Sequence, residues 1–244
     1  MENKLTKEYF DDNYVKLFEK TLESFTNKFK DDEKKSQKMF SMHYPSVGLN
    51  FENGLMIIGR ATNEWKPQFT STMDKGKLLK ECMEYSKEKE GICPLKWLGE
   101  ELPDSNGKIV LSRSPFWQIA HAVTEGLDLN KGDNWTNNIA WSNLYKIAPA
   151  DGGNPSTREG NAQWPEVRYL LEKEIETLKP KYILFITGAD WSMEFLGHLA
   201  PFKGDYVEET GWYKGAKTVI CGRPEQKQRE PFIKEVLAAF ERIV

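Results

Sequence analysis

The residues best placed for chemistry follow two apolar segments that lie far apart in the sequence. The first segment, 54–59, runs into a turn that holds Asn63 and Glu64. The second segment, 217–221, runs into Arg223 within a compact polar turn. Open α/β folds bind ligands beyond the carboxyl ends of their parallel strands, so we expect these two turns to meet at one cleft.

A third apolar segment, 139–147, contains a single amide, Asn143. A buried amide needs hydrogen-bond partners, because an unsatisfied buried polar group costs about 1–3 kcal/mol. Its carboxamide offers both donors and an acceptor, so it can bind the edge of a nucleobase or of another planar amide. The alternative is that Asn143 ties down the neighbouring backbone.

An arginine and several tryptophans are further candidates for ligand binding. Arg223 is a permanent cation suited to phosphate or carboxylate, and its alternative role is a surface ion pair. Tryptophan rings can supply a stacking surface, although many simply fill cores and rims. The tryptophans considered are Trp65, Trp141, Trp164 and Trp212.

Several well-known chemistries lack the residues that they need. The sequence has no G-x-x-x-x-G-K-[ST] loop, no G-x-G-x-x-G turn after 54–59, no H-E-x-x-H and no G-x-S-x-G. Its 3 cysteines and 3 histidines offer little for a disulfide framework or for histidine chemistry, and a four-cysteine metal site cannot be built. We therefore expect neither a cofactor nor a bound metal.

The composition is that of a chain that folds in water. Its 244 residues carry a formal net charge of −3, so the strongly basic character that favours nucleic acid is absent overall. No apolar run approaches the roughly 20 residues that span a bilayer. The N-terminal residues contain no signal-like apolar core. We expect a cytoplasmic protein without a membrane partner.

Four basic residues cluster near the C-terminal turn, and they predict either a local basic patch or a solvated helix face: Arg223, Lys227, Arg229 and Lys234.

Hydrophobic periodicity predicts an α/β fold in which helices cover both faces of a mostly parallel, four-stranded sheet. The strands are predicted at 54–59, 139–147, 182–186 and 217–221. Helices are predicted at 8–30, 115–127, 164–178, 188–196 and 228–244, with loops at 148–161 and around 204–215. We expect one domain over 1–244, with an N-terminal helical extension (1–44) and an insertion or lid (64–107).

The order of these elements resembles the uracil-DNA glycosylase superfamily over roughly residues 45–244. Residues Ser112–Ile119 are similar to the Arg-x-Phe-Trp helix of that family. Residues 178–189 are similar to its element of Leu-x-Pro-Lys, an apolar strand and Gly-x-x-Ala. The resemblance implies a three-layer α/β/α domain that acts on DNA and a hydrolase that removes a damaged, flipped base during DNA repair.

Both active-site motifs of the family differ in this sequence. The first, Gly-x-Asp-Pro or Gly-x-Asn-Pro, positions the attacking water; here it reads Gly59-Arg60-Ala61-Thr62. Asn63 or Glu64 would have to take that role from a shifted position. The second, usually His-Pro-Ser, reads Arg223-Pro224-Glu225, in which Arg223 would stabilise the departing base.

Three functions remain open. The resemblance implies that Asn143 binds the base edge, with Trp65 as a candidate stacking partner. The loss of both motif side chains favours a diverged relative that recognises a nucleobase or nucleic acid without hydrolysis. The second hypothesis is an active DNA glycosylase, and the third is an unrelated α/β protein.

Overall fold

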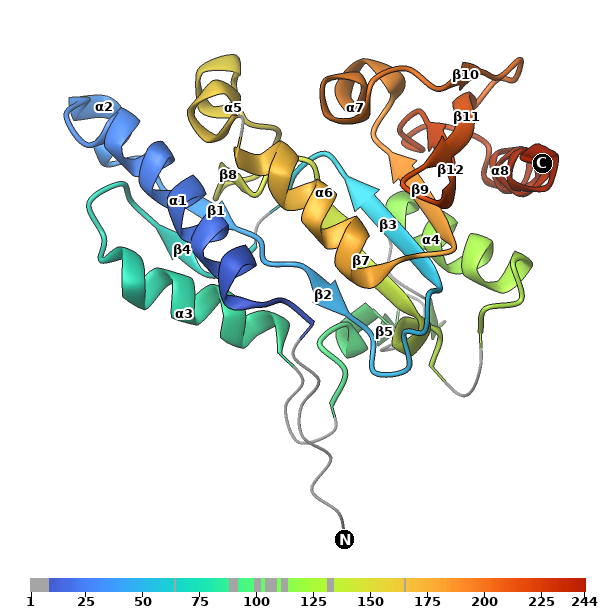
Figure 1. Cartoon of the computed structure of the whole chain (residues 1–244), viewed down its shortest axis with the longest axis horizontal. Coiled ribbons are helices and arrows are strands. Elements are labelled where there is room, and N and C mark those ends of the chain that lie inside the picture. Colours follow the sequence, from blue (N-terminus) through green and yellow to red (C-terminus); the bar gives the residue numbers. More distant parts are fainter. Residues whose placement is uncertain are drawn as a thin grey trace, which may run out of the picture. The chain divides into compact units, whose positions relative to one another are not determined.

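The computed structural model describes residues 9–63, 65–87, 92–98, 102–103, 109–110, 114–130, 134–164 and 166–244 (Figure 1). The chain forms two compact units, each assembled from three separate stretches of sequence. Unit 1 is drawn from Met1–Tyr44, Ala61–Glu90 and Asn143–Leu178. Unit 2 is drawn from Pro45–Arg60, Gly91–Ser142 and Lys179–Val244.

Unit 1 combines helices with a small antiparallel sheet. Its helices are α1 (Asp12–Phe29), α2 (Glu33–Ser36), α3 (Lys75–Ser86), α5 (Thr157–Gln163) and α6 (Glu166–Leu178). The sheet has the strand order β4 (Gln68–Phe69), β1 (Phe40–Met42) and β8 (Ile147–Pro149).

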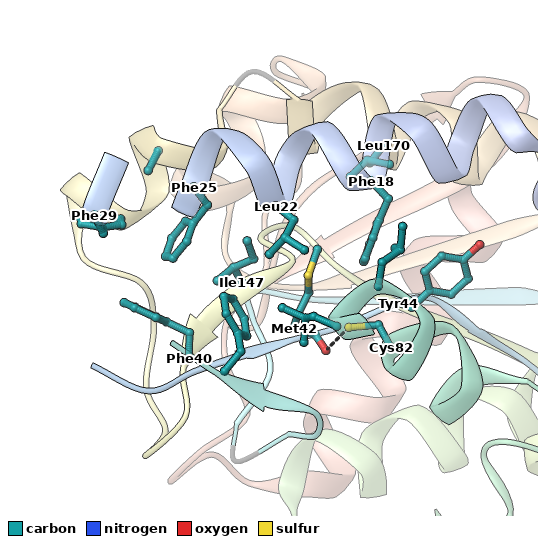
Figure 2. Packing of buried hydrophobic residues seen from close by; sticks show 14 of the residues in the cluster. Phe18, Leu22, Phe25, Phe29, Phe40, Met42, Tyr44, Cys82, Ile147 and Leu170 are labelled. Carbon is teal, nitrogen blue, oxygen red and sulfur yellow. Dashed lines mark hydrogen bonds between the residues drawn. The ribbon is translucent and has the colours of Figure 1, made fainter. Parts of the chain in front are cut away.

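Helix α1 forms the main apolar face of unit 1. Asp11 begins the helix by accepting a hydrogen bond from the backbone of Tyr14 at 2.9 Å. The apolar side chains recur at spacings of three and four, so they share one face, which packs against α3, α5 and α6. Figure 2 shows this core, in which buried side chains of α1 meet those of other elements, among them Phe18, Leu22, Phe25, Phe40, Met42, Cys82 and Leu170.

Unit 2 is built around a sheet of seven strands in the described part of the chain. Their order is β10 (Ala200–Pro201), β11 (Val207–Tyr213), β12 (Ala216–Cys221), β9 (Tyr182–Ile186), β3 (Leu55–Gly59), β7 (Ile139–Asn143) and β2 (Ser46–Val47). The remaining elements are η1 (Lys96–Leu98), β5 (Leu102–Pro103), β6 (Ile109–Val110), α4 (Pro115–Gly126), η2 (Trp135–Asn138), α7 (Ala189–Leu196) and α8 (Arg229–Arg242).

Three neighbouring strands, β3, β9 and β12, are parallel (Figure 1). Phe185 of β9 pairs with Ile58 of β3 and with Ile220 of β12, so the three strands end at nearly the same level. All of β3 is buried, as expected of a parallel strand covered on both faces. The residues that follow the three strands therefore emerge along one edge of the sheet.

The α/β class and the parallel centre of the sheet confirm the prediction, but the number of strands was wrong. Seven strands replace the predicted four, and the three additional ones, β2, β10 and β11, pair antiparallel at the sides. Strand β11 lies in the segment predicted as a connection around 204–215. An antiparallel strand can leave one face in water, so β11 contains polar residues and Gly211 and lacks the continuous apolar run by which the other strands were predicted.

Two predictions near Asn143 were also wrong. The predicted strand 139–147 ends at Asn143, and a separate strand, β8, follows in unit 1. The predicted loop 148–161 contains the start of α5, whose N-terminus carries a capping box between Ser156 and Glu159. The serine followed three residues later by a glutamate was a signal for this helix. Within the predicted insertion 64–107, the described residues include β4 and α3.

Candidate functional site

The carboxyl ends of β3, β9 and β12 bring charged residues together in unit 2. Arg60 directly follows β3, Thr187 and Gly188 follow β9, and Arg223 comes two residues after β12. This is the side of an open α/β sheet at which ligands bind. We call the group formed by Arg60, Trp191, Glu208 and Arg223 the edge site.

Arg60 is held in place from two directions. Its Nε donates to the backbone oxygen of Thr187 at 2.6 Å, and its guanidinium lies over the Trp191 ring, 4.6 Å from the ring centre. Partial burial lowers the pKa of Arg60 below its ordinary value, and the nearby charge of Arg223 lowers it further. The carboxylates of Glu225, Glu208 and Asp190 act in the opposite direction, so charges of both signs surround Arg60.

Glu208 enters the edge site through an irregularity in the sheet. The pairing of β11 with β12 shifts register between Val207 and Glu209, which leaves Glu208 as the extra residue of a β-bulge. Bulges often redirect a side chain beside a functional site. The redirected carboxylate accepts a hydrogen bond from the backbone of Ala189, at the start of α7, at 2.5 Å. A carboxylate at a helix N-terminus is favoured by the helix dipole.

Gly188 lies beside both the Arg60 cation and the Glu208 carboxylate. A Cβ placed on Gly188 would lie 3.3 Å from Nη2 of Arg60, and 3.8 and 3.9 Å from the two carboxylate oxygens of Glu208. Gly188 has a φ of 82°, which favours glycine at this position. Arg60 and Glu208 therefore pack closely over Gly188, and a larger residue there would crowd the Arg60 guanidinium.

Arg223 extends the edge site towards solvent. Its guanidinium donates to both carboxylate oxygens of Glu225, with Nη2 at 2.5 Å from Oε1 and Nε at 3.1 Å from Oε2. Burial acts to raise the pKa of Glu225, but the hydrogen bonds and charge of Arg223 outweigh it, so this pKa is lowered. The side chains are 50% and 44% exposed, so a ligand anion can reach Arg223 in competition with Glu225.

Asn143 is positioned by a different, buried group of side chains in unit 1. Its Nδ2 donates to Nδ1 of His43 at 3.2 Å, and its backbone oxygen accepts from Nζ of Lys146 at 2.8 Å. Asn143 is only 1% exposed. Burial lowers the pKa of His43 well below its ordinary value, and the charge of Lys146 adds to this effect. The neutral imidazole can therefore accept the amide hydrogen bond.

The buried group continues from Lys146 through Glu174 to Tyr14. Nζ of Lys146 lies 2.8 Å from Oε1 of Glu174, and the Tyr14 hydroxyl donates to the same oxygen at 2.6 Å. Burial lowers the pKa of Lys146, while Glu174 acts to raise it. We call Tyr14, His43, Asn143, Lys146 and Glu174 the buried network. The Asn143 side chain bonds to another side chain, the His43 ring, so both of its predicted roles, binding a base edge and fixing the neighbouring backbone, stay predictions.

Asn63 and Trp65, the other described candidates from the turn that follows β3, also belong to unit 1. Oδ1 of exposed Asn63 accepts from the backbone of Gly153 at 3.2 Å, so this oxygen already fixes a loop. The Trp65 ring lies edge-on to His43, with the ring centres 5.7 Å apart. Glu64 lies outside the described residues. The structure thus gives Asn143 and Trp65 a common neighbour, His43, but it does not bring either of them into contact with Asn63.

Sequence reasoning missed Arg60, Trp191 and Glu208 as site residues. Arg60 was visible as an arginine within the first strand-to-turn junction, at the same type of position as Arg223. Trp191 is in the first turn of α7, directly beyond the β9 junction. No local pattern identified Glu208, because its direction depends on a bulge in a strand that was not predicted.

No protein-family model matches this chain, and no curated protein matches it either. Within the described residues, no three or more His, Cys, Asp or Glu side chains are grouped to hold a metal ion. Helices in the same part of the chain are too short or too polar to cross a membrane. The edge site and the buried network must therefore be interpreted from their own chemistry.

Proposed function

We propose that this protein binds a nucleotide or nucleic acid at the edge site and that it does so without hydrolysing the ligand. The observation that carries the proposal is the placement of two arginines, Arg60 and Arg223, just beyond the carboxyl ends of the parallel strands β3 and β12. Arg223 is half exposed, so a ligand anion can compete with Glu225 for its guanidinium. Guanidinium groups suit phosphate because they donate two hydrogen bonds in a fixed plane.

The nucleobase part of the proposal is supported by two further features. Trp191 places an aromatic ring against Arg60, and aromatic rings and arginine planes are common surfaces against which bases stack. The resemblance to uracil-DNA glycosylases points to the same class of ligand. The net charge of −3 favours binding at a local site over a broad basic surface.

The residues of the turn after β3 support the proposal that the ligand is not hydrolysed. Ala61 stands where the water-positioning side chain of the resembled family would be, and it has no polar group. The oxygen of Asn63 is bonded to the Gly153 backbone. A side chain that positions attacking water must have an acceptor directed at that water. The alternative, an active DNA glycosylase, would have to rely on a second acceptor position of Asn63 or on Glu64.

Binding is tested by calorimetric titration with single-stranded and duplex oligonucleotides and with mononucleotides. Arg60→Gln and Arg223→Gln should each weaken binding about tenfold, because each removes a charge-assisted hydrogen bond. Each should also reduce the slope of log K against log salt by about 1. Arg242→Gln is the matched control, because Arg242 also stacks on an aromatic ring, that of Phe202. If no nucleotide or oligonucleotide binds, the proposal is wrong.

Hydrolysis is tested separately, by strand cleavage of oligonucleotides that contain uracil or hypoxanthine. We expect no base release by the wild-type protein. Release that is lost in Asn143→Ala would instead establish the glycosylase hypothesis and the base-binding role of Asn143.

A further inference from the structure

A small cavity opens in unit 2 between α4, α8 and the turn that follows β12. Its volume is about 110 Å³. One water molecule needs about 10–15 Å³ of such space, so the cavity has room for several waters or for a group such as a phosphate. We call this space the α4–α8 cavity, and the lining residues that give it its character are Gln118, Ile119, Pro224, Lys227, Arg229 and Phe232.

The floor and the rim of the α4–α8 cavity differ in character. Ile119, Pro224 and Phe232 are buried and apolar, so they form a floor suited to the carbon atoms of a ligand. Lys227 and Arg229 are exposed and give the rim its positive charge. A ligand that matches both parts has carbon atoms next to an anionic group, as the sugar-phosphate unit of a nucleotide does.

The rim cations lack the counter-charge that Arg223 has. Arg223 is paired with Glu225, but none of the described residues that line the α4–α8 cavity is acidic. Lys227 and Arg229 also form no ion pair within the described part of the chain. Nη1 of Arg229 donates to Oε1 of Gln118 at 3.1 Å, which holds the guanidinium at the cavity wall and leaves its other donors for a ligand. Two cations without carboxylate partners, in a chain of net charge −3, indicate an anionic ligand.

Lys227 lies on the same short turn as Arg223 of the edge site. The backbone N–H of Lys227 donates to the backbone oxygen of Pro224 at 3.1 Å. The turn therefore doubles back, and the Cα atoms of Pro224 and Lys227 lie within about 7 Å of each other. Basic side chains so close together can contact successive phosphates of one nucleic-acid strand.

We infer that the α4–α8 cavity binds a second phosphate, with its adjoining sugar, of the same ligand whose first phosphate contacts Arg223. The ligand is then an oligonucleotide strand rather than a mononucleotide. This inference rests on the proposed function and specifies its class of ligand. The alternative is the solvated helix face predicted from the sequence, in which Lys227 contributes no more than Lys234, an exposed lysine of α8 outside the cavity lining.

The inference is tested by titrating the full-length protein with thymidine monophosphate and with oligothymidylates of two, four and eight units. Affinity should rise at least about tenfold from the monophosphate to the longer strands, because a second charge-assisted contact is added. The slope of log K against log salt should become steeper by about 0.7 for each further phosphate that a single strand brings into contact.

Two lysine variants with the same change of charge locate the second contact. Lys227→Gln should weaken the binding of the longer strands about tenfold and reduce their salt slope by about 0.7, with the affinity for thymidine monophosphate unchanged. Lys234→Gln is the matched control and should weaken strand binding much less, because its side chain does not line the cavity.

Each outcome separates this inference from the proposed function. Equal affinity for the monophosphate and the strands would overturn the second phosphate position and leave nucleotide binding at the edge site intact. Tighter binding of strands that Lys227→Gln weakens no more than Lys234→Gln does would overturn the role of the α4–α8 cavity. Binding of neither the monophosphate nor any strand would reject this inference together with the proposed function.

Discussion

The buried network and the edge site are both rich in charge, yet they differ in what surrounds the charges. In the buried network, Lys146 and Glu174 are fully buried and satisfy each other within 2.8 Å. At the edge site, Arg223 and Glu225 form an equally close pair that is about half exposed. A buried pair cannot exchange its partner without a large desolvation cost, whereas an exposed pair exchanges with solvent ions and ligands.

This difference separates a structural role from a binding role. The side chains of the buried network hold unit 1 together, because their hydrogen bonds join α1, α6 and the end of β7. At the edge site, charges of both signs surround Arg60, and Arg223 is half exposed to solvent. Substitutions should therefore change stability in the first region and ligand binding in the second.

The largest expected effect is that of Glu174→Gln on stability. The change keeps the shape of the side chain but leaves the buried ammonium of Lys146 without its counter-charge. Breaking a buried pair in this way costs about 3–5 kcal/mol. Urea unfolding measures the loss, and Glu176→Gln on the exposed face of the same helix should change stability by less than about 0.5 kcal/mol. A loss below about 1 kcal/mol for Glu174→Gln would show that the pair is not structural.

Asn143→Ala should destabilise the protein by about 1–3 kcal/mol, because it leaves the buried Nδ1 of His43 without the amide donor. Asn13→Ala, at an exposed position of α1, is the control for urea unfolding. The same Asn143 variant should bind nucleotides with wild-type affinity. A marked loss of affinity at unchanged fold would instead assign base binding to Asn143 and contradict the division of roles between the two regions.

Acid should weaken the buried network through His43. Its pKa is lowered in the folded state, so the unfolded chain takes up the proton first as the pH falls. Stability should therefore decline as the pH falls below the unfolded pKa of about 6.5, by on the order of 1 kcal/mol at pH 5.5. His43→Asn keeps an acceptor for Asn143 but cannot titrate, so its unfolding free energy should vary less over this pH range. Identical profiles for the wild-type protein and His43→Asn would refute the assignment.

The sequence was sufficient to predict the parts of the fold that depend on continuous burial. The segments that became β3, β9 and β12 are apolar nearly throughout, and this pattern reveals parallel strands directly. Strand β11 could not be predicted in this way, because polar residues and a glycine interrupt it. The break after Asn143 was also hidden, because apolar residues continue on both sides of the point where the chain passes into unit 1.

For the candidate site, the sequence indicated Arg223 but not its neighbours. The position of Arg223 follows from the strand before it, which is a local property. The approach of Arg60 depends on strand order, and the direction of Glu208 depends on a bulge between distant segments. Such long-range features are decided by tertiary packing, and one sequence does not encode them in a local pattern. The roles predicted for Asn63, Glu64, Asn143 and Trp65 remain predictions.

The smallest expected change in stability is that of Arg60→Gln. The variant loses the stacking on Trp191 and alters the bond to the Thr187 backbone, but Arg60 is only partly buried. A cation–π contact at such a position contributes about 0.5–1 kcal/mol. The change removes both the repulsion by Arg223 and the attraction to Glu225, Glu208 and Asp190, and these act in opposite directions. Urea unfolding should therefore show a loss below about 1 kcal/mol, while nucleotide titration of the same sample shows weakened binding. A loss as large as that of Glu174→Gln would mean that Arg60 is structural, and the distinction between the edge site and the buried network would fail.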